Sequence, residues 1–170
     1  GMKMNRNSAL IWLPEIEALG LPTPKTMIVP YDHRFFAAGM EDGIDIREPI
    51  KALGFEVVSA CEKIGWPSFI RTDLGSAKHS GPSGYLADNP LSIKQILYNL
   101  IEDQEIKFWM TGQPPEVFLV REFLSLDASF TAFHGLPISR EWRFFADGEK
   151  VQCYHPYWPE SALEGRVDDP

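Results

Sequence analysis

The hydrophobic pattern of the chain changes character at Gln113-Pro114-Pro115. Before this point apolar residues recur every three or four positions, most clearly between Ile93 and Ile101, where Asn89-Pro90 is typical of a helix start. After it, short apolar or alternating runs are typical of strands. We therefore expect helices with short strands first and an antiparallel sheet afterwards, which is the α+β class.

Glycine and proline set the expected boundaries of these elements. Gly20 and Gly65 are expected to end helices, and Asp147-Gly148 predicts a β-hairpin. We expect Tyr31–Pro49 to form a loop with at most one helical turn. The predicted helices are Ser8–Leu19, Phe55–Ile64 and Leu91–Asp103, and the predicted strands are one ending near Pro30, then Ser68–Thr72, Tyr85–Leu86, Val117–Leu124, Ala128–Phe133, Ser139–Ala146 and Lys150–Tyr154.

Length and charge restrict the organisation and the partners of the chain. Its 170 residues suit one domain or two small lobes, and we expect an N-terminal segment at 2–66, a lobe at 67–115 and a sheet lobe at 116–170. Sixteen basic against 24 acidic residues give a net charge of −8, which argues against a nucleic acid partner. No apolar run reaches the roughly 18 to 20 residues of a membrane span. Cys61 and Cys153 have no metal-ligand spacing, so we expect reduced thiols and a cytoplasmic protein.

The segment from Gly75 to Gly84 is rich in small residues and contains Lys78. Small residues allow backbone N–H groups to approach phosphate oxygens, and a lysine supplies a compact positive charge. The segment is not a Walker loop, because the Gly-Lys-Ser/Thr ending is absent. It is therefore either a phosphate-binding loop or a mobile surface hairpin with a solvated lysine.

Two later strands carry charge beside apolar residues. Alternation predicts that Glu141 and Arg143 share one strand face, while Trp142 and Phe144 occupy the other. If Trp142 and Phe144 face a core, then Glu141 and Arg143 face water or a cleft. A guanidinium fixed on a sheet suits phosphate or carboxylate, and the alternative is a solvated face with cross-strand salt bridges. The strand Val117–Leu124 ends in charge, so it is either a strand that reaches a nucleotide cleft or a plain core strand.

Taken in order, these segments resemble the ATP-grasp superfamily of ATP-dependent ligases. Four motifs follow one another at plausible spacing between Leu19 and Tyr154. They are the turn-rich run Leu19–Thr26, the strand motif Lys63–Arg71, the glycine-rich loop Gly75–Gly84 and the strand Val120–Leu124.

The resemblance implies that ATP binds between two α+β lobes, with Mg²⁺ offsetting the phosphate charge. Arg71 stands where the family has a phosphate-binding lysine, and Lys78 is the loop cation. Arg143 would face the phosphates or an acyl phosphate, which gives catalytic roles to Arg143 and Lys78. The implied nucleotide-binding residues are Arg71, Lys78, Gly75, Gly81, Gly84, Glu122, Phe123, Leu124 and Glu141.

The implied function is that of the ATP-binding domain of an ADP-forming ligase, which activates a small-molecule or peptide carboxylate as an acyl phosphate. The family's metal ligands, an acidic residue and a Glu-x-Asn pair, have no match before Pro170, because Asp168 and Asp169 lie in another context. We therefore assign no metal ligand. We expect the remainder of that site beyond Pro170, or nucleotide binding without full catalysis.

Two other functions compete with this interpretation. A nucleotidyl-transferring enzyme such as an RNA ligase also uses lysine, ATP and antiparallel sheets, but its Lys-x-Asp-Gly motif is absent. A small non-catalytic α+β binding module would account for the lack of metal ligands. A covalent AMP adduct on Lys78 would favour the first of these, and a glycine-rich loop without affinity for anions would favour the second.

Overall fold

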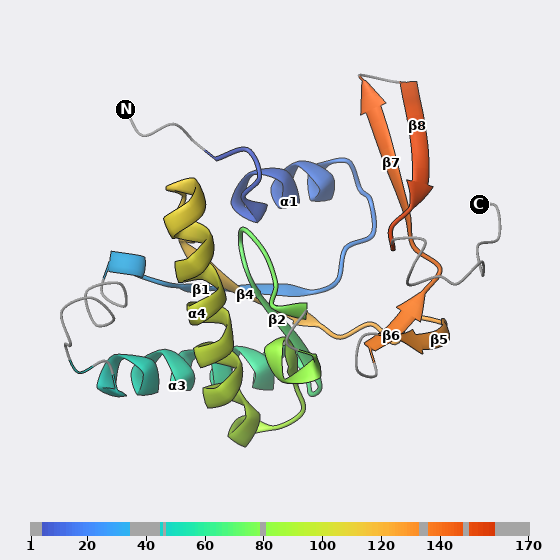
Figure 1. The fold of residues 1–170 in the computed structure, drawn as a ribbon. Coiled ribbons are helices and arrows are strands. Elements are labelled where there is room, and N and C mark those ends of the chain that lie inside the picture. Colours follow the sequence, from blue (N-terminus) through green and yellow to red (C-terminus); the bar gives the residue numbers. More distant parts are fainter. Residues whose placement is uncertain are drawn as a thin grey trace. The chain divides into compact units, whose positions relative to one another are not determined.

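The computed structural model describes residues 5–34, 45, 47–78, 81–132, 136–147 and 150–158. The chain forms two compact units, Gly1–Leu124 and Ser125–Pro170 (Figure 1). The described part of the first unit contains helices and antiparallel strands, and the described part of the second contains antiparallel strands. The fold class is α+β. The division falls at Leu124, unlike the boundaries expected at residues 66 and 115, because the strand that follows residue 115 pairs with two earlier strands.

The first unit is built on one antiparallel sheet. Its strands are β1 (Thr26–Pro30), β2 (Ser68–Thr72), β3 (Leu86–Ala87) and β4 (Val117–Glu122). Their order is β1-β4-β2-β3, and every neighbouring pair is antiparallel. Strand β4 therefore has a partner on each side, with Leu119 opposite Ile28 and Val120 opposite Ile70.

Helices cover the two sides of this sheet. Helices α3 (Arg47–Ile64) and α4 (Ile93–Thr111) pack on one side, and α1 (Ala9–Ala18) packs on the other (Figure 1). The side chains of β4 alternate between these layers, so that Phe118 joins the α3 and α4 core and Leu119 contacts the α1 side. The strand is therefore buried on both faces.

The larger core lies between the sheet and α3 and α4. Apolar residues recur every three or four positions along both helices, which gives each one a continuous buried stripe. Each fully buried aliphatic side chain contributes roughly 1.5–3 kcal/mol relative to an exposed one. The core includes Val29, Ile50, Leu53, Val57, Ala60, Cys61, Ile70, Ile93, Ile96, Leu97, Leu100, Ile101, Phe118 and Val120.

The helices are longer than the sequence predicts. Helix α3 begins at Arg47 rather than Phe55, because Pro49 occupies the first turn, where a backbone N–H has no intrahelical partner to lose. Helix α4 continues past Asp103 to Thr111, where Gly112 in the left-handed region (φ 67°) ends it. Among the described helices, none has the length and apolar character needed to cross a membrane.

Other predicted boundaries are confirmed. Strand β2 has the predicted bounds, and Gly65 follows α3 with φ 110°. The Ser8 side chain caps α1 by accepting a hydrogen bond from the Leu10 amide. Helix α1 forms although Pro14 lies inside it. The region Tyr31–Pro49, which is expected to form a loop with at most one helical turn, contains the start of α3 at Arg47.

The second unit contains two antiparallel pairs. Strand β5 (Ala128–Ala132) pairs with β6 (Leu136–Ser139), and β7 (Trp142–Asp147) pairs with β8 (Lys150–Pro156). The predicted single strand Ser139–Ala146 is wrong, because Ser139 ends β6 and its hydroxyl donates to Glu141 Oε1 at 2.6 Å. The hairpin predicted at Asp147-Gly148 is confirmed by the pairing of β7 with β8, although Gly148 itself lies outside the described residues.

Asp73, directly after β2, connects three elements of the first unit. Its carboxylate accepts hydrogen bonds from the Ser8 hydroxyl at 2.6 Å and from the Glu116 amide at 3.0 Å. Its backbone carbonyl accepts from the Ala9 amide, and its amide donates to the Val117 carbonyl. Because the residue is 1% exposed, it holds the start of α1 and the start of β4 against the end of β2 from within the protein.

Replacing this carboxylate tests its structural role. We expect Asp73→Ala to lower the free energy of unfolding by about 2–3 kcal/mol, because buried amide and hydroxyl donors lose a charged acceptor. Urea denaturation followed by circular dichroism measures the change. Asp88→Ala, at an exposed acidic position, is the control and should change the value by less than about 0.5 kcal/mol. Equal effects of the two substitutions would contradict the role given to Asp73.

The two cysteines differ in environment and should differ in reactivity. Cys61 lies in the core, and burial raises the pKa of its thiol to about 11, whereas Cys153 is exposed on β8. Because the thiolate is the reactive form, Cys61 should be inert at pH 8. We expect Ellman's reagent to titrate one thiol rapidly in the native protein and the second only in denaturant. Rapid reaction of both thiols in the native protein would contradict this prediction.

Candidate functional site

The side of the first unit's sheet that faces away from α3 and α4 carries several cations. We call it the cationic face and define it by Phe69, Arg71, Lys78, Tyr85 and Arg121. Its orientation follows from β2, in which Ser68, Ile70 and Thr72 are buried while Phe69 and Arg71 are half-buried. Since Ile70 belongs to the α3 and α4 core, the alternate residues Phe69 and Arg71 point to the opposite side.

Arg71 is held at the centre of this face. It stands opposite Leu119 of β4, and its Nε donates to the Thr72 carbonyl at 2.9 Å. Its guanidinium carbon lies 5.9 Å from the ring centroid of Trp12, within the range of a cation–π contact. Trp12 of α1 thus contacts the guanidinium of the arginine that the sequence predicts for phosphate binding.

Lys78 reaches the same face from the glycine-rich loop. Its Nζ lies 5.8 Å from the ring centroid of Phe69, and the Tyr85 ring lies 5.3 Å from that of Phe69 on β2. In the described part of the chain, no carboxylate approaches Lys78 Nζ closely enough to form an ion pair. The sequence prediction that Lys78 and Arg71 serve one site is compatible with their common position over β2.

Arg121 is a third cation of this face, and it is not among the site residues predicted from the sequence. It stands opposite Phe69 in the sheet register and therefore lies diagonal to Arg71, roughly 7–8 Å away at Cα. Its Nε donates to the Thr26 hydroxyl at 3.2 Å. Burial lowers the pKa of Arg121, while the negative charge of Glu17 acts in the opposite direction. The alternation of β4, from Leu119 to Arg121, is the signal that reveals it.

The electrostatics of this face favour a bound anion. Arg71 and Arg121 are like charges on neighbouring strands, and a half-buried guanidinium is poorly solvated. Among the described carboxylates, none forms an ion pair with Arg121. Guanidinium groups bind phosphate or carboxylate in bidentate fashion, and Lys78 adds a point charge. An oxyanion above Phe69 would therefore offset the mutual repulsion of these cations.

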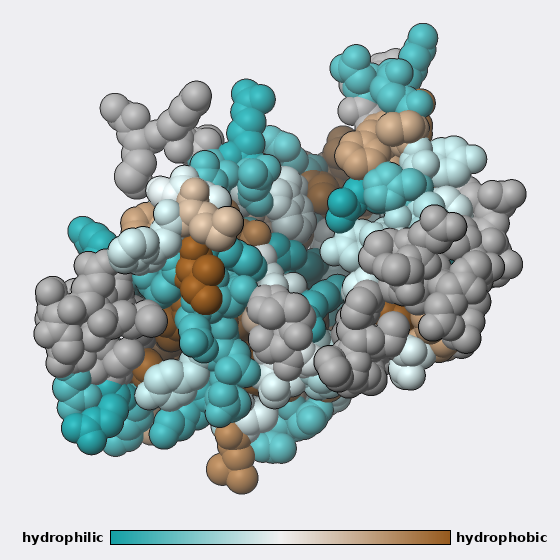
Figure 2. Space-filling model, in the orientation of Figure 1, coloured by the Kyte–Doolittle hydropathy of each residue, from teal (hydrophilic) through white to brown (hydrophobic). Residues whose placement is uncertain are grey.

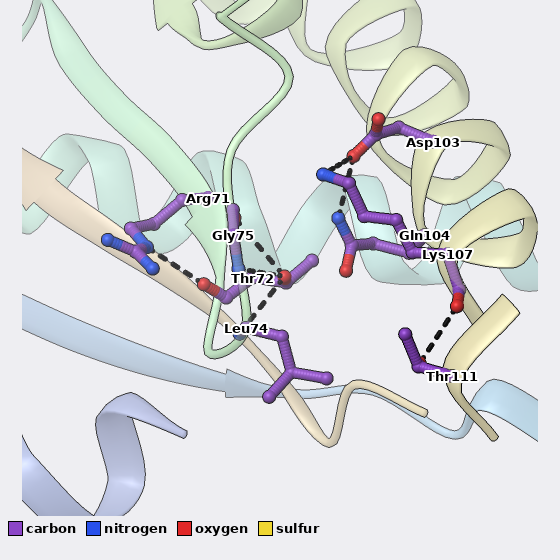
Figure 3. Close-up of polar contacts among 8 residues, drawn as sticks. All are labelled: Arg71, Thr72, Leu74, Gly75, Asp103, Gln104, Lys107 and Thr111. Atoms are coloured by element: carbon purple, nitrogen blue, oxygen red, sulfur yellow. Dashed lines mark hydrogen bonds and ion pairs between the residues drawn. The ribbon is translucent and has the colours of Figure 1, made fainter. Parts of the chain in front are cut away.

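The start of the glycine-rich loop is a tight turn beside α4. The Thr72 hydroxyl accepts hydrogen bonds from the Leu74 and Gly75 amides, at 3.3 Å and 3.1 Å. A side chain at Gly75 would lie 3.4 Å from Lys107 Nζ. Figure 3 shows this turn between Arg71 and α4, so that Arg71 points away from the helix and Lys107 points toward the turn. Gly75 is thus adjacent to α4, unlike Lys78 at the cationic face.

The end of the loop is also held by hydrogen bonds. Gly81 has φ 71°, a conformation that favours glycine, and its amide donates to the Lys78 carbonyl at 3.1 Å. Gly84 is buried, and its amide donates to the Gly81 carbonyl at 2.9 Å. The Asn99 side chain donates to the Ser83 carbonyl, which ties this end to α4. The glycines therefore shape a loop that packs on α4 at both ends.

The predicted adenine-binding residues are the last three of the first unit. The Glu122 carboxylate accepts a hydrogen bond from the Lys25 amide at 3.3 Å, and the Glu122 amide donates to the Lys25 carbonyl. Phe123 and Leu124 are 37% and 46% exposed. The partly exposed side chains of Phe123 and Leu124 therefore lie where the chain leaves the sheet, two and three residues after Arg121.

Arg143 and Glu141 belong to the second unit. The Arg143 guanidinium carbon lies 4.7 Å from the Tyr157 ring centroid, and Glu141 precedes β7. Phe144 packs on Tyr154, but it is 56% exposed, so the condition that it faces a core is not met among the described residues. The convergence of Arg143 with Arg71 stays a prediction, because the two residues lie in different units.

Anion binding at the cationic face is directly testable. We expect sodium tripolyphosphate to raise the thermal midpoint of the protein, because a ligand of the native state alone stabilises it. Arg71→Ala and Arg121→Ala should each reduce the shift by more than half, since each removes a charged hydrogen-bond donor. Differential scanning fluorimetry measures the effect. Lys63→Ala, which removes an exposed cation of α3, should keep the full shift. Equal shifts in all four proteins would exclude this face as the site.

The comparison with known proteins adds no assignment to these observations. No family model, no curated protein sequence and no solved structure matches this chain.

Proposed function

We propose that this chain is the ATP-binding part of an ADP-forming ligase that activates a carboxylate as an acyl phosphate. The observation that carries the proposal is the cationic face, where Arg71, Lys78 and Arg121 lie on one side of one sheet in a chain of net charge −8. The order of the sequence motifs resembling the ATP-grasp superfamily supports it. So does the antiparallel sheet, which has α3 and α4 on one side and the cations, beside α1, on the other.

The triphosphate would lie across the cationic face. Arg71 and Arg121, with their forked donors, suit the non-bridging oxygens of two neighbouring phosphates. Lys78, above the Phe69 ring, would neutralise the terminal phosphate from the loop side. Because the guanidinium groups of Arg71 and Arg121 are already held by Trp12 and Thr26, less side-chain entropy is lost on binding.

The adenine would lie at the end of β4. The segment Glu122–Leu124 combines backbone donors and acceptors with the partly exposed side chains of Phe123 and Leu124. A flat heterocycle needs this combination of apolar contact and a few directed hydrogen bonds. Since Arg121 directly precedes this segment, one strand would connect the two ends of the nucleotide.

The described residues do not fit a magnesium site. Among them no group of three or more His, Cys, Asp or Glu side chains could hold a metal ion. Asp168 and Asp169 lie outside the described residues. We therefore derive no step through Mg²⁺, although the proposed reaction uses ATP with this ion as its co-substrate.

The proposed chemistry is a phosphoryl transfer followed by acyl transfer. A carboxylate oxygen attacks the γ-phosphorus of ATP, the bond between this phosphorus and the β,γ-bridging oxygen breaks, and ADP leaves. An amine or thiol then attacks the carbonyl carbon of the acyl phosphate and releases phosphate. Arg71 and Lys78 would hold the charge on the transferred group.

A non-catalytic nucleotide-binding module is the second candidate. The lack of a metal-binding group among the described residues favours it. The two candidates differ in turnover, because only a ligase releases ADP when a carboxylate and an amine or thiol are present. The nucleotidyl-transferring alternative differs again, since it would leave AMP covalently attached to a lysine.

Nucleotide binding can be separated from plain anion binding. We expect Mg-ATP to bind more tightly than tripolyphosphate, because the adenine adds apolar contacts at the end of β4. Phe123→Ala should then weaken Mg-ATP about tenfold and leave tripolyphosphate unchanged, which corresponds to about 1.4 kcal/mol. Arg121→Ala should weaken both ligands. Isothermal titration calorimetry measures these constants.

Leu91→Ala, at an exposed apolar residue before α4, is the matched control for Phe123→Ala and should leave both affinities unchanged. Binding of tripolyphosphate without any preference for Mg-ATP would leave the anion site standing and reject the nucleotide.

A further inference from the structure

A hollow of about 440 Å³ opens between α3 and α4. It lies within the first unit, among the helices that cover the side of the sheet opposite the cationic face. Its volume falls in the range of about 300–1,000 Å³ that is usual for small-molecule sites. The lining residues are Arg47, Glu48, Ile50, Lys51, Gly54, Phe55, Val58, Pro90, Ile93, Lys94 and Tyr98.

The walls of this hollow are apolar. Ile50 and Ile93 belong to the core and form the inner wall, while Val58 and Tyr98 are half-buried. Phe55 is 67% exposed, although a large aromatic side chain on a helix usually packs against a neighbouring element. The hollow therefore exposes apolar surface that a ligand would remove from water.

Gly54 creates much of this space. It lies in the interior of α3, where glycine costs roughly 0.5–1 kcal/mol relative to alanine. Close packing of the two helices does not require it, because a side-chain carbon at Gly54 would meet only Leu97 Cδ1, at 4.0 Å. Gly54 therefore destabilises α3 relative to alanine, and close approach of the α3 and α4 backbones does not explain its presence. Its effect is to leave the hollow open.

The rim of the hollow is positively charged. Among the residues that line the hollow, the cations are Arg47, Lys51 and Lys94, and Glu48 is the one carboxylate, in a chain whose net charge is −8. Lys51 lies 3.8 Å from Glu48, and Arg47 lies 2.7 Å from Asp45, but these side chains are all more than half exposed. Exposed pairs of this kind contribute little, so an incoming anion can compete for the cations.

Lys94 is the cation most available to a ligand. Its Nζ lies 6.0 Å from the ring centroid of Tyr98, which also lines the hollow. In the described part of the chain, no carboxylate forms an ion pair with it. A ligand whose apolar body fills the hollow would therefore bring an acidic group within reach of Lys94.

We propose that this hollow binds a small amphipathic carboxylate, with the apolar body between α3 and α4 and the carboxylate at Lys94, Arg47 and Lys51. The apolar walls recognise the body and the basic rim selects the anion. This site goes beyond the proposed nucleotide function, because it lies on the other side of the sheet and uses none of the residues of the cationic face. Its test requires no nucleotide.

The first experiment measures binding and charge selection with decanoate, 2-naphthoate and decylamine. We expect both carboxylates to shift the amide resonances of Gly54, Phe55 and Lys94 in a saturable way in ¹H–¹⁵N spectra. Decylamine, which has an alkyl chain but a cationic head, should bind at least tenfold more weakly than decanoate. Equal affinity for decylamine, shifts confined to other regions, or no binding at millimolar concentration would overturn the proposal.

Variants separate filling of the hollow from the charge of its rim. Gly54→Leu should abolish binding of decanoate and keep or raise the thermal midpoint, because leucine favours helix more than glycine. Ser59→Leu adds a leucine at an exposed position of α3 outside the hollow, and it should bind as the natural protein does. Lys94→Glu should weaken decanoate at least tenfold and leave decanol unchanged.

A folded Gly54→Leu variant that retains full affinity for decanoate would reject this site. Equal weakening of decanoate and decanol by Lys94→Glu would reject the role of the rim. Loss of Mg-ATP binding at the cationic face would affect neither result, so the two proposals fail independently.

Discussion

The burial of β4 on both faces is the constraint on which the first unit depends. Val117 and Leu119 face α1, while Phe118 and Val120 face α3 and α4. A charge at any of these four positions would lack solvent and partners, and it would cost several kcal/mol. The charges of the strand are therefore confined to its end. Arg121 and Glu122 consequently lie together where the chain leaves the sheet.

The neighbouring strand β2 is fully buried on one side only, and this difference creates the cationic face. Ser68, Ile70 and Thr72 are buried under the helices, so the alternate positions carry Phe69 and Arg71 toward the less covered side. The antiparallel register then brings Phe69 opposite Arg121. Local alternation fixes which residues share the face, and strand pairing fixes which of them are neighbours.

The sequence predicts these local features better than the contacts between them. The bounds of β2 and the Ser8 cap follow from short-range chemistry and are confirmed. The start of α3 does not follow from short-range chemistry, because Pro49 and Gly54 are both residues that usually interrupt a helix. In the structure Pro49 lies in the first turn of α3 and Gly54 lies in its interior. Arg121 is missed since its relation to Arg71 exists only through the register of distant strands. The packing of the Gly75 turn beside α4 is also a contact that composition cannot reveal.

The hollow and the cationic face lie on opposite sides of the sheet of the first unit. Ile50 and Ile93 line the hollow, and both belong to the core that contains Ile70 of β2. Arg71 follows Ile70 directly and points to the other side of the sheet. Close-packed interiors transmit small displacements, because their side chains have little free volume in which to relax. The packed core that contains Ile70 therefore lies between a carboxylate bound at the helices and the opposite face of the sheet.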